Sequence, residues 1–243
     1  MIARIILIIL SLFVLSGCKG SQRFSLHSSL LGEFARTTAN VVEKKGRYAI
    51  QVDVRSVGLY NLIRGQRIEQ YRSKGTVRGG RYYAHHFAIE KWANNTHTLA
   101  EYLFDYRRKK ITRRFRSWDL KTNKLTEDVR DPMPYFGHDD FMTVLHNALH
   151  NQPSTKGVRK TFILAGADNS NGQVPVYITN DSSRVQRWGG VSGGTVIQLG
   201  VKKAIFDGDK GSLTFILDPN RNPRSIVIKK VKIVGTVTGK PIQ

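Results

Sequence analysis

The sequence predicts a mainly β protein, built as a curled antiparallel sheet or an open β-barrel-like domain with one amphipathic helix at about 140–151. Short segments with period-two alternation, or with many β-branched and aromatic residues, follow one another from Glu33 onward. Clusters of Gly, Asn, Asp and Lys separate these segments and mark turns. A helical spacing of apolar residues distinguishes one segment from the rest. A sheet of this length must close, split or curl to protect its edges.

The expected strands form a meander of antiparallel hairpins. Gly79 and Gly80 mark one hairpin turn, and the basic residues 107–110 mark another. The expected strands are 48–54, 63–73, 82–92, 98–106, 111–118, 160–164, 174–179, 185–188, 195–199, 213–217 and a C-terminal strand pair within 225–237.

The expected helix begins at Asp140 and ends at Asn151. Asp139 and Asp140 supply carboxylates that suit a helix N-terminus, and Pro153 lies just beyond the other end. We expect this helix to plug one mouth of the curled sheet or to lie along its open side. The apolar residues at i, i+3, i+4, i+7 and i+8 are Phe141, Val144, Leu145, Ala148 and Leu149.

The N-terminus resembles that of a bacterial lipoprotein. Arg4 precedes an apolar run over residues 5–15, which has the length of a signal-peptide core and is shorter than the roughly 18 residues that span hydrocarbon. Residues 15–18, Leu-Ser-Gly-Cys, resemble the lipobox, in which small residues precede a cysteine whose sulfur carries diacylglycerol. We therefore expect residues 1–17 to be a signal peptide and Cys18 to hold the mature protein at a membrane through acyl chains.

Cysteine usage and the residues next to Cys18 extend this interpretation. Cys18 is the single cysteine of the 243 residues, so disulfides within the chain, thiol catalysis and cysteine zinc sites are excluded. Lys19 stands where an aspartate would retain an enteric lipoprotein in the inner membrane, which favours a periplasm-facing position at the outer membrane. Residues 18–32, rich in Ser, are expected to be a flexible tether, and residues 33–243 a single β-rich domain.

The mature chain is strongly basic. Removal of residues 1–17 takes away Arg4 and no acidic residue, which leaves 38 basic and 18 acidic side chains and a formal charge of +20. Such a charge commonly indicates nucleic acid as the partner, but an exported protein meets lipid phosphates instead. The expected partner is an anionic membrane surface, as lipid or lipopolysaccharide, and not nucleic acid. The alternative is a basic but merely solvated surface.

Four short motifs, taken together, resemble the motifs of a single protein family. They are Gly46-Arg47-Tyr48 in an early strand, Phe104-Asp105-Tyr106 before a basic turn, Asp139-Asp140-Phe141 at the helix, and residues 215–223, which place an Asp-containing turn and a proline before the final strands. Together they resemble the proteobacterial periplasmic family known as domain of unknown function 3108, over about residues 33–241. The resemblance implies a β-rich envelope domain without an assigned reaction.

Motifs that would support catalysis or metal binding are incomplete. Residues 190–194, Gly-Val-Ser-Gly-Gly, match the serine hydrolase elbow, but the next residues favour a strand over the required helix and no histidine follows His150. His146 and His150 have i, i+4 spacing without the glutamate of HExxH. Residues 207–211 lack the later ligands of a calcium loop. We expect no catalytic residue, no metal site and no cofactor.

The strongest surface feature is a basic segment between residues 107 and 118, which is expected to form a hairpin. Guanidinium groups pair with phosphate through two hydrogen bonds, and aromatic rings are favoured at membrane interfaces. A solvated hairpin tip is the alternative. The candidate residues for an anionic surface are Arg107, Arg108, Lys109, Lys110, Arg113, Arg114 and Arg116, and the candidate interfacial aromatics are Phe115 and Trp118.

The expected function is that of a non-enzymatic envelope lipoprotein that binds a lipid, lipopolysaccharide or a protein partner. One alternative is a hydrolase that acts on an envelope polymer, with a site assembled from residues distant in sequence. A buried polar cleft with paired carboxylates would favour the hydrolase, and an apolar lumen would favour binding. A second alternative is a structural assembly factor.

Overall fold

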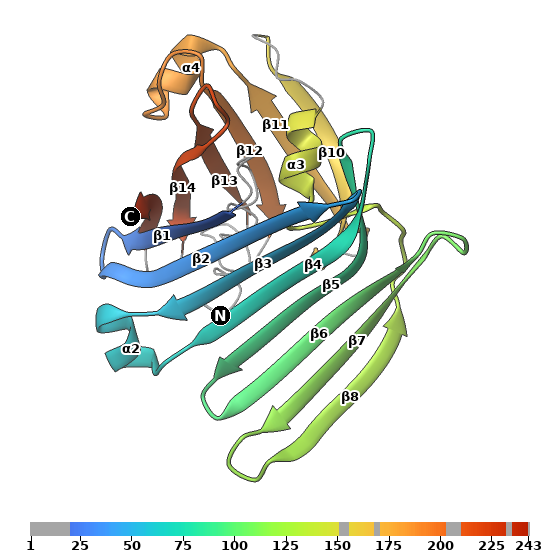
Figure 1. The fold of residues 1–243 in the computed structure, drawn as a ribbon. Helices are drawn as coiled ribbons and strands as arrows, with labels where there is room; N and C mark the ends of the chain where they lie inside the picture. The colour runs from blue at the N-terminus through green and yellow to red at the C-terminus, as the bar shows by residue number, and fades with distance from the viewer. Residues whose placement is uncertain (1–19, 151–155, 168–170, 203–209, 232–234, 243) are drawn as a thin grey trace.

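A computed structural model describes residues 20–150, 156–167, 171–202, 210–231 and 235–242. Within these residues the strands join into one 15-stranded sheet, in the order β8-β7-β6-β5-β4-β3-β2-β1-β15-β14-β13-β12-β11-β10-β9 (Figure 1). The strands are β1 (Gly20–Ser28), β2 (Gly32–Lys44), β3 (Arg47–Ser56), β4 (Ile68–Arg78), β5 (Arg81–Ala93), β6 (Thr96–Asp105), β7 (Lys110–Asp119), β8 (Lys124–Pro132), β9 (Asp139–Asp140), β10 (Val158–Ala165), β11 (Gln173–Thr179), β12 (Thr195–Lys202), β13 (Lys210–Leu217), β14 (Pro223–Val231) and β15 (Gly235–Ile242).

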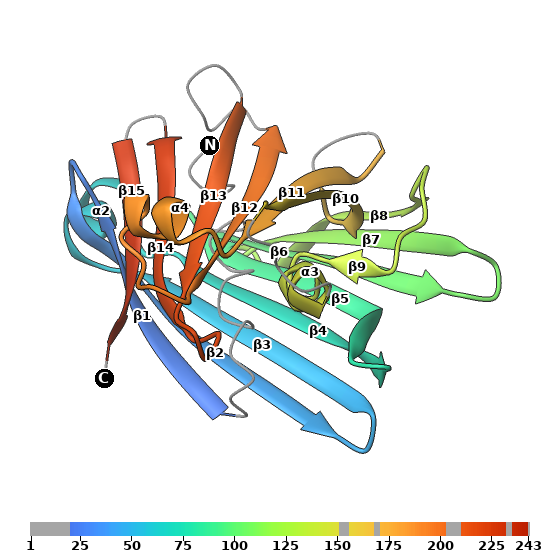
Figure 2. The same ribbon diagram turned by 90° about the horizontal axis from the view of Figure 1, so that it is seen from above.

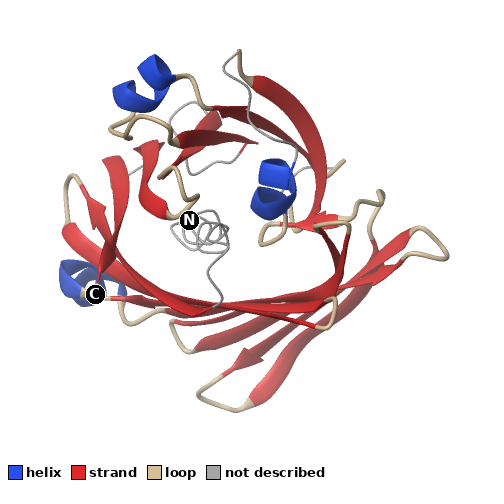
Figure 3. Cartoon of the chain, turned by 45° about the horizontal axis from the view of Figure 1, so that its top comes forward, coloured by secondary structure: helices blue, strands red, loops and turns tan. Residues whose placement is uncertain are grey.

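The sheet curls without closing, which confirms the predicted fold class. Neighbouring strands are antiparallel, except that the short β9 runs parallel to β10. Because β8 and β9 stand at the two ends of the strand order, the sheet keeps two edges. Figure 3 shows the curl, with strands around an interior and the described helices beside it.

The core lies on the concave face of the curled sheet. Every second residue of β3 is buried and the residues between are intermediate or exposed, so one face of the strand packs in the core and the other faces solvent. Tyr71, Phe24, Phe34, Phe87 and Phe215 are the largest fully buried side chains. β8 differs because every one of its residues is exposed, and Figure 1 shows β6, β7 and β8 extending away from β10–β14. β8 therefore has two solvent-facing sides.

The predicted tether over 18–32 is wrong for residues 20–28, which form β1. Phe24 and Leu26 are 1% and 0% exposed and pack in the core, and β1 pairs with both β2 and β15. The strand escaped prediction because two apolar residues among polar ones give too short an alternation. The folded domain therefore begins at Gly20 rather than at Glu33, while Cys18 lies outside the described residues.

The described helices differ in two ways from the single helix that was predicted at 140–151. Helix α3 spans Val144–His150. It begins later than predicted because Asp139 and Asp140 belong to β9 and residues 141–143 form a turn, while the predicted last residue, Asn151, lies outside the described residues. The five apolar residues that predicted it are all buried. The other described helices are α2 (Gly58–Arg64) and α4 (Ser182–Arg187).

Three strand predictions need correction. Residues 185–188 were expected to be a strand, but Asp181 accepts hydrogen bonds from the backbone N–H groups of Ser183 and Arg184 and so caps α4. The strand expected at 63–73 begins only at Ile68, because α2 extends to Arg64 and residues 65–67 form neither helix nor strand. β8 was not expected, since a fully exposed strand has no apolar alternation.

Among the described residues, no helix has the length and apolar character needed to cross a membrane.

Candidate anion-binding surface

The predicted basic segment divides into a hairpin tip and a strand. Residues 106–109 form the turn between β6 and β7, and the side chains of Arg107, Arg108, Lys109 and Lys110 are exposed. Arg108 is 3.9 Å from Asp105, and Asp105 also accepts a hydrogen bond from the backbone N–H of Arg108. The tip thus presents four exposed cations, of which Arg108 alone is paired with a carboxylate among the described residues.

Two basic residues of β7, Arg114 and Arg116, are compensated by acidic neighbours. Arg114 makes two hydrogen bonds with Asp128 of β8, at 2.9 and 2.6 Å, and its guanidinium holds the pKa of Asp128 below the usual value. Arg116 Nη2 lies 2.7 Å from Glu101 Oε2 on β6. These two arginines therefore stabilise the pairing of the outer strands and leave less charge available for a partner than the tip does.

The two candidate aromatic residues lie on opposite faces of the sheet. Consecutive side chains of a strand alternate in direction, so Phe115 shares a face with Arg113 and Trp118 shares the other face with Arg116. The guanidinium carbon of Arg113 is 5.2 Å from the ring centre of Phe115, and that of Arg116 is 5.4 Å from Trp118. A membrane lying against one face of the sheet therefore contacts one of these rings and not the other.

Trp118 is part of an aromatic ladder across three strands. Its ring lies 4.7 Å from that of His97, which lies 4.8 Å from the ring of Trp92 at an interplanar angle of 5°. His97 Nε2 is 2.9 Å from Glu90 Oε1, and Glu90 also binds Arg72. The stacking on His97 gives Trp118 a structural role.

A buried pair of carboxylates lies at the start of α3, where the sequence predicted only helix caps. Asp139 and Asp140 are 4% and 0% exposed, and burial raises the pKa of each to about 6. Asp140 accepts hydrogen bonds from Ser73 Oγ at 2.6 Å and from the backbone N–H groups of Met142 and Thr143 at 2.7 and 2.9 Å. The hydrogen bonds of Asp140 therefore connect β4 to the turn before α3.

Asn147 connects this acidic pair to β5. Its Oδ1 accepts a hydrogen bond from the backbone N–H of Tyr82, and its Nδ2 donates to the carbonyl of the same residue, both at 2.8 Å. Nδ2 also donates to Asp139. Since α3 also contacts β11, this helix joins two parts of the sheet that are far apart in the strand order.

The two histidines of α3 have different environments. His146 is partly buried, with its ring 4.4 Å from that of Tyr82, and the desolvation of the ring lowers its pKa to about 3. His150 is exposed. The sequence analysis missed this cluster; the signal that could have found it is the pair of polar residues Thr143 and Asn147, at i and i+4 beside the apolar positions of the predicted helix.

Comparison with known proteins adds a likeness of fold. No family model matches the chain, and no curated protein matches it, so the resemblance to domain of unknown function 3108 stays a prediction. The chain is similar to a crystal structure described as a beta-barrel-like protein of domain of unknown function DUF1849 from Brucella abortus. The two share 12% sequence identity, with 92% of this chain and 95% of that chain covered and a TM-score of 0.49.

Proposed function

We propose that this protein is a non-enzymatic envelope lipoprotein, anchored through Cys18, that binds an anionic lipid or lipopolysaccharide through the tip of the β6–β7 hairpin. The observation that carries the proposal is the contrast between that tip and the strand behind it. Arg114 and Arg116 are held by carboxylates at 2.6 and 2.7 Å, whereas of the four exposed cations of residues 107–110 only Arg108 forms an ion pair among the described residues, with Asp105 at 3.9 Å. Membership of the 3108 family and a position at the outer membrane belong to the same proposal.

The anchor is tested by the chemistry of Cys18. The mature protein should begin at this residue and carry fatty acid, which mass spectrometry of the purified N-terminal peptide detects. Replacement Cys18→Ser should abolish fatty acid incorporation and leave the leader uncleaved. A wild-type protein with an intact leader and an unmodified thiol would disprove the anchor.

Ligand binding is tested by the lipids that purify with the protein from its native membrane. We expect anionic lipid or lipopolysaccharide to be enriched over its share of the membrane, because each Lys or Arg near an anionic surface contributes about 1 kcal/mol. The variant in which residues 107–110 are all replaced by Gln should lose that enrichment. A protein partner retained without any enriched lipid would replace lipid as the ligand.

The hydrolase alternative has one observation in its favour, the buried pair Asp139 and Asp140. A catalytic carboxylate must reach its substrate within hydrogen-bond distance, but these two side chains are almost fully buried and bound to Ser73, Thr143 and Asn147. We therefore assign the pair to the attachment of α3. Hydrolysis of an envelope polymer by the wild type, lost in Asp139→Asn with folding retained, would reverse this assignment.

A further inference from the structure

Alternate hairpin turns of the first eight strands lie at the same end of the sheet. The turns β2–β3, β4–β5 and β6–β7 are closed by the pairs Lys44 with Arg47, Arg78 with Arg81, and Asp105 with Lys110. The pairing of Gly20 with Val41 places the start of β1 at that end as well. Figure 2 shows the start of β1 and the β2–β3 hairpin along the lower side, with α2 on the opposite side.

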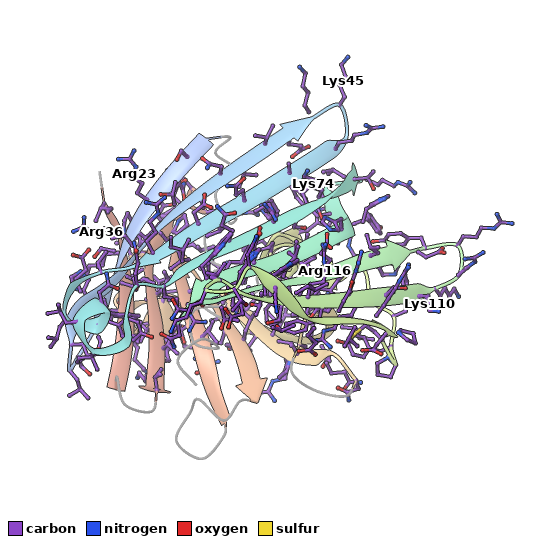
Figure 4. All side chains as sticks on the ribbon, turned by 90° about the horizontal axis from the view of Figure 1, so that it is seen from below. Arg23, Arg36, Lys45, Lys74, Lys110 and Arg116 are labelled. Atoms are coloured by element: carbon purple, nitrogen blue, oxygen red, sulfur yellow. The ribbon has the colours of Figure 1, made fainter. Side chains whose placement is uncertain are left out.

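This end of the sheet is rich in exposed cations, which we call the basic rim. Figure 4 places Lys45 at the β2–β3 hairpin and Lys110 at the β6–β7 hairpin. Among the described residues of the rim, Arg108 alone forms an ion pair, with Asp105 at 3.9 Å. The rim consists of Lys44, Lys45, Arg47, Arg78, Arg107, Arg108, Lys109 and Lys110, all exposed.

The opposite end of the same strands has a different character. Its turns expose apolar side chains, including Leu30, Leu62 and Ile63. Arg67, which lies there, is bound to the buried Glu69. Lys121 lies in the β7–β8 turn and Lys124 begins β8. The charge is therefore distributed along the strand direction, with the larger share of exposed cations at the rim.

A hollow within the rim indicates the chemistry of the partner. Lys44, Lys45 and Arg47 line it together with Val42, Tyr48 and Ala49. Cationic groups beside an apolar floor suit a phosphate that is joined to a hydrocarbon-bearing group. Because the cations stand on three separate hairpins, the matching partner presents many phosphates over a surface, as an anionic bilayer does.

The length of the chain between rim and anchor supplies the second observation. Gly20 is two residues after Cys18, and a fully extended chain spans about 3.3–3.6 Å per residue. Cys18 therefore lies within about 7 Å of the start of β1. This is comparable to the screening length of about 8 Å at physiological ionic strength, so rim charges beside β1 would interact with lipid phosphates around the anchor.

We propose that the basic rim docks on the phosphate layer of the bilayer that holds the acyl chains of Cys18, with the strands directed away from the membrane. The proposal rests on the anchor in the proposed function. It extends the binding surface from one hairpin to three and gives the molecule an orientation. The end that contains α2 then faces away from the membrane.

The orientation is measured with fluorescent labels on the lipidated protein in vesicles of phosphatidylglycerol and phosphatidylcholine. Cys18 is the sole cysteine and is blocked by lipid, so Arg78→Cys and Thr122→Cys each introduce a single labelling site. A strand of the length of β7, Lys110–Asp119, separates the two ends by about 33 Å. A nitroxide on the lipid headgroup should quench the label at the rim and leave the label at residue 122 bright.

The matched variants change the same charge at opposite ends. Lys44→Glu with Arg107→Glu alters the rim, and Lys121→Glu with Lys124→Glu alters the far turn. At about 1 kcal/mol per cation, the rim pair should lower the ratio of docked to undocked protein at least about 30-fold at low salt. The far pair should leave the ratio unchanged, and vesicles of phosphatidylcholine alone should abolish the difference between the variants.

Each other outcome counts against the orientation. Stronger quenching at residue 122 would show that the apolar end with α2 contacts the membrane instead. If the protein is fully lipidated but the rim variant and the wild type are quenched equally, this inference is overturned while the anchor still stands. A protein without fatty acid at Cys18 would overturn both the proposed function and the docking that rests on it.

Discussion

Replacing Asn147 with Ala should strongly destabilise the fold, because this fully buried side chain attaches α3 to β5. The change removes the hydrogen bonds to the N–H and carbonyl groups of Tyr82 and the bond to Asp139. Leaving a buried polar partner unsatisfied costs about 1–3 kcal/mol. Three such partners, with water entering the vacated space, give a loss of about 3–6 kcal/mol, a large part of the roughly 5–15 kcal/mol that stabilises a domain.

The assay is urea unfolding of the purified protein, followed by circular dichroism and tryptophan fluorescence. Asn40→Ala on the outer face of β2, where the side chain is only partly buried, is the control and should change stability by less than about 0.5 kcal/mol. A loss below about 1 kcal/mol for Asn147→Ala would refute the role given to α3 as a connection between two parts of the sheet.

Three further predictions test the fold. His146 stays neutral when folded because burial lowers its pKa to about 3 from an ordinary 6.5; the stability that depends on its neutral form is therefore lost as pH falls from about 6.5 toward about 3. His146→Leu should reduce the fall in unfolding free energy between pH 7 and pH 4.5, and an equal fall in both proteins would contradict this. Leu26→Ala should cost about 2–5 kcal/mol in urea unfolding if β1 belongs to the core, whereas a tether would give no change. Gly75→Ala should lower the free energy of unfolding by about 1–3 kcal/mol, because a Cβ there would lie 1.9 Å from the carbonyl oxygen of Tyr83 at the β4–β5 bulge. A thermal melting temperature equal to that of the wild type would exclude this clash.

The candidate surface was only partly visible in the sequence. The run from Arg107 to Trp118 predicted a basic hairpin, and the turn at 106–109 is where it was expected. The pairing of Arg114 with Asp128 and of Arg116 with Glu101 was not visible, because each carboxylate lies on a neighbouring strand at a sequence distance of 14 or 15 residues. Strand register decides which cations are compensated.

Local patterns in the sequence determined the class of fold and the hairpin succession. Alternation of polar and apolar residues predicts strands, and glycine pairs such as Gly79-Gly80 predict turns, since both act over a few residues. The apolar spacing that predicted α3 identified the apolar side chains that the helix buries, but not the buried Asn147. The leader and the residues around Cys18 predict export and attachment to a membrane, and this stays a prediction.

Tertiary structure alone decided that β1 belongs to the sheet and where the ends of the hairpins gather. The pairing of β1 with β15 joins residues more than 200 positions apart, as in the hydrogen bond from the N–H of Thr236 to Ser29 Oγ. No local pattern specifies such a partner, because the free energy that selects it comes from apolar faces buried together only when the whole sheet curls. The basic rim exists for the same reason, since it is the strand order that brings three separate turns to one end.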